Sequence, residues 1–437
     1  MKFLTVIISL SISLRAISQT PLDEYIRQAI ANNGSIKEQK EWVEEKKSDL
    51  LLAKKNYSPE IGFVGNYTLA AGGRTIAFPV GDLLNETYST LNQLTKTNKF
   101  PQLQNQNVQF LPNNFYDLKA RIIQPIIRPE IKINESLKQE QVNLQEIQVD
   151  ITSRDLTLEI KKAYYQYLQA GKVIEILNQS LVILDEGERV TRSMINNGVG
   201  LPSNMLRIQS ERGKINTQLF GARNQLRDAK EYFNYLIGRN ASDSIIPMIV
   251  TELPDPNQYS QDIKNEELST IDRSLAMQQL AIDLEKKYHA PRLGAQLDIG
   301  SQNFNFKWGG YVLGGLQLDI PIWNNHKSDL KQTSIHHAMN AVKEKKEYAT
   351  QGIHLQLEQA KRGLLTSIDQ YHSYTPLQDM NRRYYNDLLK KYKEGQVNPS
   401  ELIDAQSQIT LADLQQNIAL YQSWIKAAEL ERLTKKN

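Results

Sequence analysis

Apolar residues recur in alternating steps of four and three along the stretch that follows Pro129 and ends near Asn197. The seam consists of Leu156, Ile160, Ala163, Tyr167, Ala170, Ile174, Leu177, Leu181 and Leu184. A mean spacing of about 3.5 residues is typical of a helix that packs in a coiled coil. The pattern therefore predicts one long helix over 129–197, roughly 100 Å in length at about 1.5 Å per residue.

The same spacing returns in the second half of the chain. The matching positions are Ile353, Leu357, Ala360 and Leu364. They lie in a predicted helix over 325–394, in which Pro376 predicts an interruption and a kink. Shorter helices are expected over 22–57, 203–236, 267–288 and 400–435. Taken alone, this pattern would fit a coiled coil with a purely structural role.

Four short stretches alternate between apolar and other residues with a period of two, which is typical of β-strands. They lie at about 59–70, 115–125, 291–301 and 311–321. The residues that face away from the apolar side in the second and fourth stretches include Asp117, Lys119, Arg121, Gln317 and Asp319. A sheet over a core would bury such charges, whereas a membrane barrel would place them in a polar lumen. The alternation therefore predicts that these five residues face a lumen.

Four strands cannot close a barrel, and an open sheet edge cannot face lipid. Other copies of the chain must therefore complete the sheet, with eight strands from two copies or twelve from three. Physical reasoning alone does not choose between these numbers. Tyr67, Trp308 and Trp323 lie where an aromatic girdle would meet the membrane surface. The fold class expected is α+β, mainly α, with long coiled-coil helices and a barrel shared between copies.

One stretch of the chain occurs twice. Residues 197–211 read NGVGLPSNMLRIQSE and residues 394–408 read EGQVNPSELIDAQSQ, with Gly198 aligned to Gly395. Proline pairs earlier in each half follow in the same order, so the chain is predicted to hold two structural repeats, 19–236 and 267–437, joined by a linker over 237–266. Each turn glycine suits a helix end that needs positive φ, and Ser203 and Ser400 are expected to cap the helices that follow.

The first repeat contains an insertion. The interval from Pro59 to Pro125 spans 66 residues, whereas the matching interval from Pro291 to Pro321 spans 30. The additional residues fall around 72–114, a segment rich in Asn, Gln and Thr. The composition predicts a long loop, which is usually functional or mobile.

The N-terminus has the pattern of a secretory signal, with Lys2, an apolar run from Phe3 to Leu14 and small residues up to Ser18. A signal peptide over 1–18 is therefore expected, and its run is too short for a membrane anchor. The chain has no cysteine, which excludes disulfides and thiolate metal sites, and its net charge of +3 gives no attraction to nucleic acid. An exported protein of this kind could be periplasmic, secreted or a β-structure of the outer membrane.

Enzymatic motifs are missing from the sequence. His336 and His337 lack the HExxH context of a zinc site, and neither a GxSxG motif nor a phosphate-binding loop occurs. The stretch GGYVLGG lies in a predicted strand and lacks the spacing of a dinucleotide site. We therefore expect no catalysis and no cofactor.

The signal peptide, the two helical repeats, the paired strands that end in proline and the doubled turn together resemble the outer-membrane efflux protein family, typified by TolC. The resemblance covers nearly all of the mature chain. It implies a homotrimer with a twelve-stranded barrel in the lipid of the outer membrane and a helical barrel in the periplasm. It further implies an exit duct that docks onto a periplasmic adaptor protein and an inner-membrane pump.

The resemblance also assigns roles to residues near the doubled turn. It places Glu401 and Asp404, six and nine positions after Gly395, in acidic rings at the narrowest point of the duct. The two are one helical turn apart and so share a face. The alternative is that both are solvated acids favoured by the helix dipole.

In this family a tyrosine three positions before the second glycine bonds an acid six positions after the first. Tyr392 matches the tyrosine, whereas Asn204 stands in place of the acid and Val397 in place of an arginine. The closed tip is therefore expected to hold a neutral bond between Tyr392 and Asn204. The turn residues implied in tip closure and adaptor docking are Gly198, Val199, Gly200, Leu201, Ser203, Gly395 and Ser400.

A periplasmic coiled-coil adaptor or scaffold of an export complex is the alternative function. Such a protein would share the helical hairpins but would not need four amphipathic strands. Dependence on detergent for solubility separates the two interpretations.

Overall fold

The computed structural model describes residues 20–109, 114–263 and 266–436, so the expected signal peptide lies outside the described residues. The chain divides into two compact units. Among the described residues, the helical unit comprises 20–46, 140–263, 266–276 and 337–436, and the sheet unit comprises 47–109, 114–139 and 277–336. The boundaries between the units fall inside helices α2, α4, α6 and α7.

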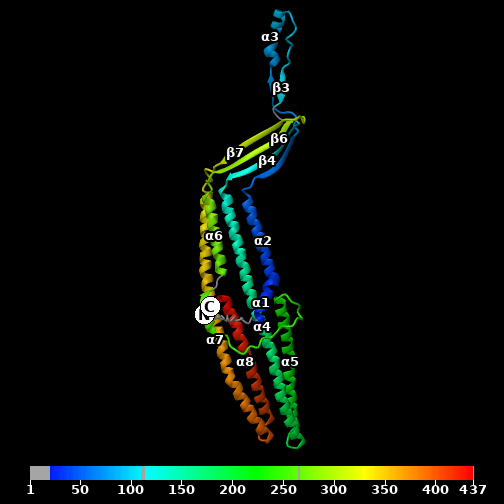
Figure 1. Cartoon of the computed structure of the whole chain (residues 1–437), viewed down its shortest axis with the longest axis vertical. Coiled ribbons are helices and arrows are strands. Elements are labelled where there is room, and N and C mark those ends of the chain that lie inside the picture. The colour runs from blue at the N-terminus through cyan, green and yellow to red at the C-terminus, as the bar shows by residue number, and fades with distance from the viewer. Residues whose placement is uncertain (1–19, 110–113, 264–265, 437) are drawn as a thin grey trace, which may run out of the picture. The chain divides into compact units, whose positions relative to one another are not determined.

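Long helices make up most of the chain. They are α1 (Pro21–Asn32), α2 (Gly34–Lys55), α4 (Pro129–Asn196), α5 (Pro202–Leu236), α6 (Glu266–Lys286), α7 (Lys327–Lys393) and α8 (Pro399–Leu433). Figure 1 shows α4 with α5, and α7 with α8, as two hairpins of the helical unit. None of the helices in the described part of the chain carries an apolar stretch long enough to cross a membrane.

An aromatic cluster forms the largest core of the helical unit. The ring of Phe233 on α5 lies 5.2 Å from that of Tyr25 on α1 and 5.6 Å from that of Tyr164 on α4. Phe233 and Tyr164 are fully buried. The hydroxyl of Tyr164 donates to the carbonyl of Ile246 at 2.9 Å and accepts from the N–H of Met248 at 2.9 Å. These bonds fix the segment that links the two repeats against α4.

Two expectations for the helices were wrong. The predicted helix over 22–57 is divided between α1 and α2, because the side chain of Asn33 accepts from the N–H of Ser35 and donates to the carbonyl of Leu236, both at 2.9 Å. A side chain that bonds the backbone in this way ends a helix. The predicted interruption at Pro376 does not occur, since α7 continues through it.

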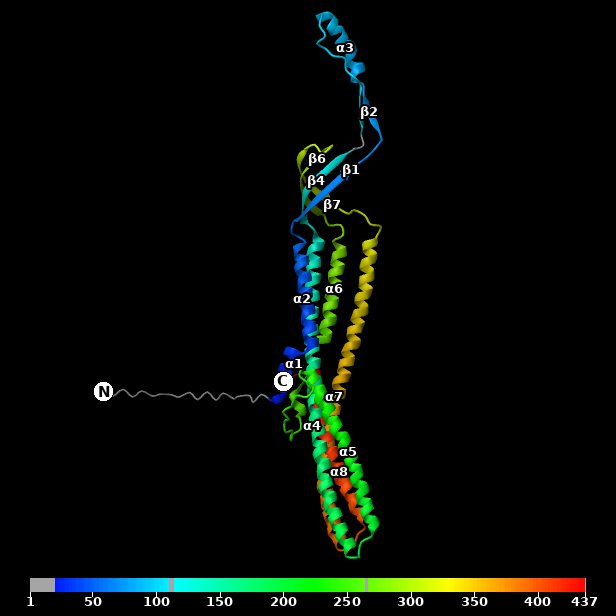
Figure 2. The ribbon, with the colours of Figure 1, turned by 90° about the vertical axis from the view of Figure 1, so that its right-hand side faces the viewer.

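The sheet unit contains an antiparallel sheet of four strands in the order β1-β4-β6-β7. Figure 2 labels these strands. The strands are β1 (Glu60–Thr68), β4 (Phe115–Ile127), β6 (Arg292–Phe304) and β7 (Gly310–Asp319). Their register places the junctions to α2, α4, α6 and α7 at one end of the sheet. The turn between β6 and β7 and the insertion between β1 and β4 leave from the other end. β1 and β7 are open edges of the sheet.

The insertion is not the long loop that its composition predicted. It contains β2 (Thr75–Phe78), α3 (Val80–Thr95) and β3 (Gln106–Gln109), with β2 paired to β3. Composition was misleading because asparagine side chains of α3 bond the backbone of the irregular chain between α3 and β3. The remaining elements are a short 3₁₀ helix (Pro256–Gln258) and the pair β5 (Tyr259–Ile263) and β8 (Thr434–Lys436) of the helical unit.

Candidate functional site

Each of the two long helices is followed, two residues after its end, by a glycine with positive φ, as expected for the doubled turn. φ is 78° at Gly198 and 76° at Gly395. The N–H of Val199 donates back to the carbonyl of Met194 at 3.0 Å, and the N–H of Gln396 makes the equivalent bond at 2.9 Å. This is the Schellman ending of a helix. The two repeats therefore close their long helices in the same way.

The caps of the following helices differ from the expectation. Each helix begins at the proline that precedes the serine, so Ser203 and Ser400 lie within the first turn and cap neither helix. The cap of α8 is Asn398, whose Oδ1 accepts from the N–H of Ser400 at 3.0 Å. Leu201 stands at the cap of α5 without a side-chain bond. Proline suits the first helical position, where its missing N–H loses no partner, and this moves the cap to the preceding residue.

Tyr392 bonds Thr191 in this structure, and the predicted bond to Asn204 is not made. The tyrosine is 1% exposed, and its hydroxyl lies 2.6 Å from that of Thr191 on α4. Because the threonine hydroxyl donates to the carbonyl of Gly187 at 2.8 Å, it accepts from the tyrosine. Burial raises the pKa of Tyr392, so its hydroxyl keeps the proton needed for this bond. Asn204 lines the same hollow between the turns, together with Val199, Leu201 and Val397.

Glu401 and Asp404 project from the first turns of α8 and are both exposed. The carboxylate of Asp404 lies 3.7 Å from the guanidinium of Arg207 on α5. Arg207 and Asp404 each stand nine positions after the glycine of their turn, so the two repeats carry opposite charges at equivalent places. Their side chains are 47% and 70% exposed, and such a pair contributes only about 0–1 kcal/mol to stability. Its consequence is electrostatic, because it places a cation beside Asp404.

The charged residues of β4 in the sheet unit are paired. Arg121 donates through Nε and Nη2 to both carboxylate oxygens of Asp298 on β6, at 2.9 and 2.8 Å. Strand register places the two residues directly opposite each other. Lys119 forms an ion pair with Asp117, which also accepts from the hydroxyl of Tyr311 at 2.7 Å. Bidentate pairing of this kind holds the side chains in fixed positions on one face.

Gln317 and Asp319 of β7 lie on this same face. Arg121 is opposite Asp298 and Asp298 is opposite Leu313, so residues an even number of positions from Leu313 share the face. Asp319 lies 3.5 Å from the guanidinium of Arg292. Register therefore brings the five residues predicted from alternation to one side of the sheet. That this side lines a lumen stays a prediction.

The opposite face of the sheet is apolar and exposed. Ile61, Phe63, Val312, Leu316 and Leu318 lie there, each between 62% and 74% exposed. Tyr67, Trp308 and Trp323 are 55%, 83% and 75% exposed. A face of this kind is unfavourable in water, because each uncovered aliphatic side chain forgoes about 1.5–3 kcal/mol of burial. This face is therefore suited to an apolar surrounding.

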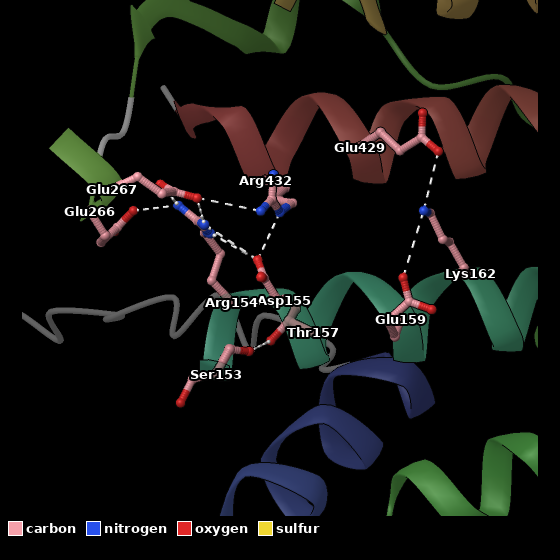
Figure 3. A network of polar contacts seen from close by, with 10 residues as sticks. All are labelled: Ser153, Arg154, Asp155, Thr157, Glu159, Lys162, Glu266, Glu267, Glu429 and Arg432. Carbon is pink, nitrogen blue, oxygen red and sulfur yellow. Dashed lines mark hydrogen bonds and ion pairs between the residues drawn. The ribbon is translucent and has the colours of Figure 1, made fainter. Parts of the chain in front are cut away.

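A cluster of charged side chains, here called the arginine clasp, joins α4, α6 and α8 (Figure 3). Arg154 on α4 donates to Glu266 at 2.6 Å and to Glu267, both in the first turn of α6. Arg432 on α8 donates to Asp155 at 2.7 Å and to Glu267 at 3.4 Å. Burial alone would raise the pKa of Glu267, but the hydrogen bond and charge of Arg154 outweigh it and lower that pKa.

Replacing Arg154 with methionine is expected to lower the free energy of unfolding near neutral pH by about 1–3 kcal/mol, since nearby carboxylates lose their hydrogen-bond donor. Because the pKa of Glu267 is lowered in the fold, its contribution is present above the usual value of 4.5 and is lost as pH falls further. The difference in melting temperature between wild type and Arg154→Met, measured by circular dichroism, should therefore become smaller below about pH 4.5. Arg273→Met is the matched control, because its 3.2 Å pair with Glu140 leaves it 45% exposed. A difference independent of pH would contradict this account.

Sequence reasoning missed two residues near the turns. Arg207 was open to detection, because the repeat alignment pairs it with Asp404. Thr191 carried no signal, since it precedes Tyr392 by 201 positions and lies on another helix.

The fold of the chain is that of outer-membrane channel proteins. It matches the outer-membrane channel OprN with a TM-score of 0.74 and 14% identity, over 94% of this chain and 89% of that one. It matches the outer membrane protein VceC of Vibrio cholerae with a TM-score of 0.73 and 9% identity, over 94% of each chain. It matches the open state of the MtrE channel of Neisseria gonorrhoeae with a TM-score of 0.72 and 12% identity, over 94% of this chain and 88% of that one. No protein-family model and no curated protein matches the chain. The resemblance predicted from the sequence is thus confirmed for the fold.

Proposed function

We propose that this chain is the subunit of an outer-membrane channel that serves as the exit duct of a tripartite efflux or secretion system. Three copies would share one twelve-stranded barrel, and their helices would form a duct in the periplasm. An adaptor protein and an inner-membrane pump would dock onto this duct. Substrates would pass through it passively, under the control of a gate at the helix tips. The likeness of the fold to outer-membrane channels supports this proposal.

The single observation that carries the proposal is the sheet with one apolar and one charged face. Its apolar face suits lipid, and its paired charges suit a water-filled lumen. The open edges of β1 and β7 would each meet the sheet of another copy, which satisfies their backbone groups within the membrane.

A periplasmic adaptor or scaffold is the second candidate, since the helical hairpins alone would serve it. The exposed apolar sheet face argues against this function. Extraction from membranes separates the two: the channel should sediment with outer membranes and need detergent, whereas an adaptor of this kind would be recovered in the soluble periplasmic fraction.

The repeats support a particular contact between copies in the helical region. Within one chain, Gln406 on α8 donates to Ser180 on α4, and both are 2% exposed. The equivalent residues are Gln209 on α5 and Leu377 on α7, and both are exposed. A ring in which α7 of one copy meets α5 of the next would repeat the internal contact and cover both residues. Leu206, the equivalent of the buried Ile403, is 67% exposed and would be covered as well.

A double variant, Gln209→Cys with Leu377→Cys, is expected to form disulfides between copies on mild oxidation. Because the chain has no other cysteine, denaturing gels without reductant should show linked dimers and trimers. The matched control is Ser180→Cys with Gln406→Cys, which should link only within one chain. This contact would be ruled out if the control variant forms its disulfide while the test variant gives no linked copies.

The gate would form where three copies bring their turns together. Six carboxylates, from Glu401 and Asp404, would then surround one aperture together with three Arg207 guanidinium groups. The bond between Tyr392 and Thr191 would hold α7 against α4 in the closed tip. The exposed turn residues Val199 and Leu201, 72% and 67% exposed, would offer the adaptor an apolar contact.

A further inference from the structure

The insertion between β1 and β4 holds its own shape through asparagine side chains. Asn85 on α3 donates to the carbonyl of Leu103 at 2.9 Å and accepts from its N–H at 2.7 Å. Asn92 makes the same two bonds with Phe100, at 2.8 and 3.1 Å. Each side chain thus pairs with the backbone as a neighbouring strand would. The face of α3 that bears these asparagines is therefore occupied by the returning chain.

The start of α3 is fixed in the same manner. Asn105 accepts from the N–H of Gly81 at 2.9 Å and of Asp82 at 3.2 Å. A Cβ on Gly81 would lie 2.5 Å from the carbonyl oxygen of Leu103, so only glycine fits there. These contacts make the insertion a preformed element rather than a loop that adapts to a partner.

The opposite side of α3 carries an uncovered stripe. Its residues are Leu83, Thr87, Thr90 and Leu94, spaced by four, three and four, which is the seam of a short coiled coil. Leu83 and Leu94 are 71% and 76% exposed. The hydroxyl of Thr90 donates to the carbonyl of Glu86 at 3.0 Å, so its methyl group is free to pack.

Two features favour a second copy of α3 as the partner of this stripe. A contact about a symmetry axis brings each residue close to its own counterpart, and the stripe holds no charge that would repel itself. The insertion also leaves the sheet at the end opposite to the helix junctions, next to the open edge of β1. Copies joined through their sheets would hold their insertions together at high effective concentration, which favours contact along a seam of only about three turns.

We propose that the α3 helices of the three copies pack against one another along this stripe and form a lid over the outer mouth of the channel. The inference rests on the trimeric channel proposed above. The lid would be a second constriction, at the end of the duct opposite to the helix tips. Three copies of an uncharged seam would present a neutral surface there, in contrast to the charged tip.

Single cysteines test the lid, because the chain has none of its own. Leu94→Cys in the full-length protein in outer membranes, treated with a short bismaleimide, should give linked dimers. The matched control is Gln93→Cys, which is also exposed but lies about 100° away around the helix. Linking at Leu94→Cys should exceed that at Gln93→Cys at least several-fold. A membrane-impermeant maleimide should label Leu94→Cys more slowly than Gln93→Cys.

Equal linking at both positions would show random collision and overturn the lid. Absence of linking at both positions would overturn it as well, and the channel proposal would stand if Gln209→Cys with Leu377→Cys still links copies. Failure of both tests would reject the lid and the trimer together.

Discussion

Replacing Glu401 and Asp404 together with alanine is expected to remove most of the cation preference proposed for the channel, together with any block by divalent cations. In the proposed trimer, six carboxylates would surround a narrow aperture and create a potential of several kT that attracts cations. Three Arg207 side chains would remain in the double variant, which further reduces its preference for cations. Single-channel currents in planar bilayers at low salt, where screening is weakest, measure this change.

Arg207→Ala is the matched control for the gate, because the pair with Asp404 predicts an effect of opposite sign. Removing the guanidinium of Arg207 should increase the preference of the channel for cations and strengthen its block by divalent cations. Retention of wild-type selectivity in both variants would mean that these residues are only solvent-exposed charges on α5 and α8 and that the gate lies elsewhere.

Phe233→Ala is expected to reduce stability more than any other single change considered. Phe233 is fully buried between Tyr25 and Tyr164, and truncation of such a ring costs about 3–5 kcal/mol. The variant should lose its helical circular dichroism signal at a markedly lower temperature and be cleaved faster by protease.

Tyr235→Ala serves as the comparison for this core, since Tyr235 lies two residues away on the same helix and is 75% exposed. We expect it to change stability by no more than about 0.5 kcal/mol. An equal loss of stability in both variants would show that the aromatic cluster does not stabilise the helical unit.

The main helices and strands followed from periodicity, because each long helix and each strand repeats its pattern over many turns or pairs. Local exceptions did not follow. Asn33 ends α1 through bonds to its own neighbourhood and to Leu236, which is 203 positions away. Similarly, α3 was missed because Asn85 and Asn105 find backbone partners 18 and 24 positions away. A prediction from composition alone assigns such asparagines to a loop.

The candidate site was predictable where one strand or one turn defines it. Asp117, Lys119 and Arg121 share a face because a strand alternates, and the turn glycines adopt positive φ because a helix ends there. Partners on other helices were not predictable. Tyr392 bonds Thr191 through the packing of α7 on α4, which no spacing along the chain specifies.

The number of copies in a detergent-solubilised particle tests the central claim most directly. Native mass spectrometry of the protein extracted from outer membranes in mild detergent should find three copies, which separate on heating. A homogeneous monomer that stays in solution without detergent would contradict the channel proposed here.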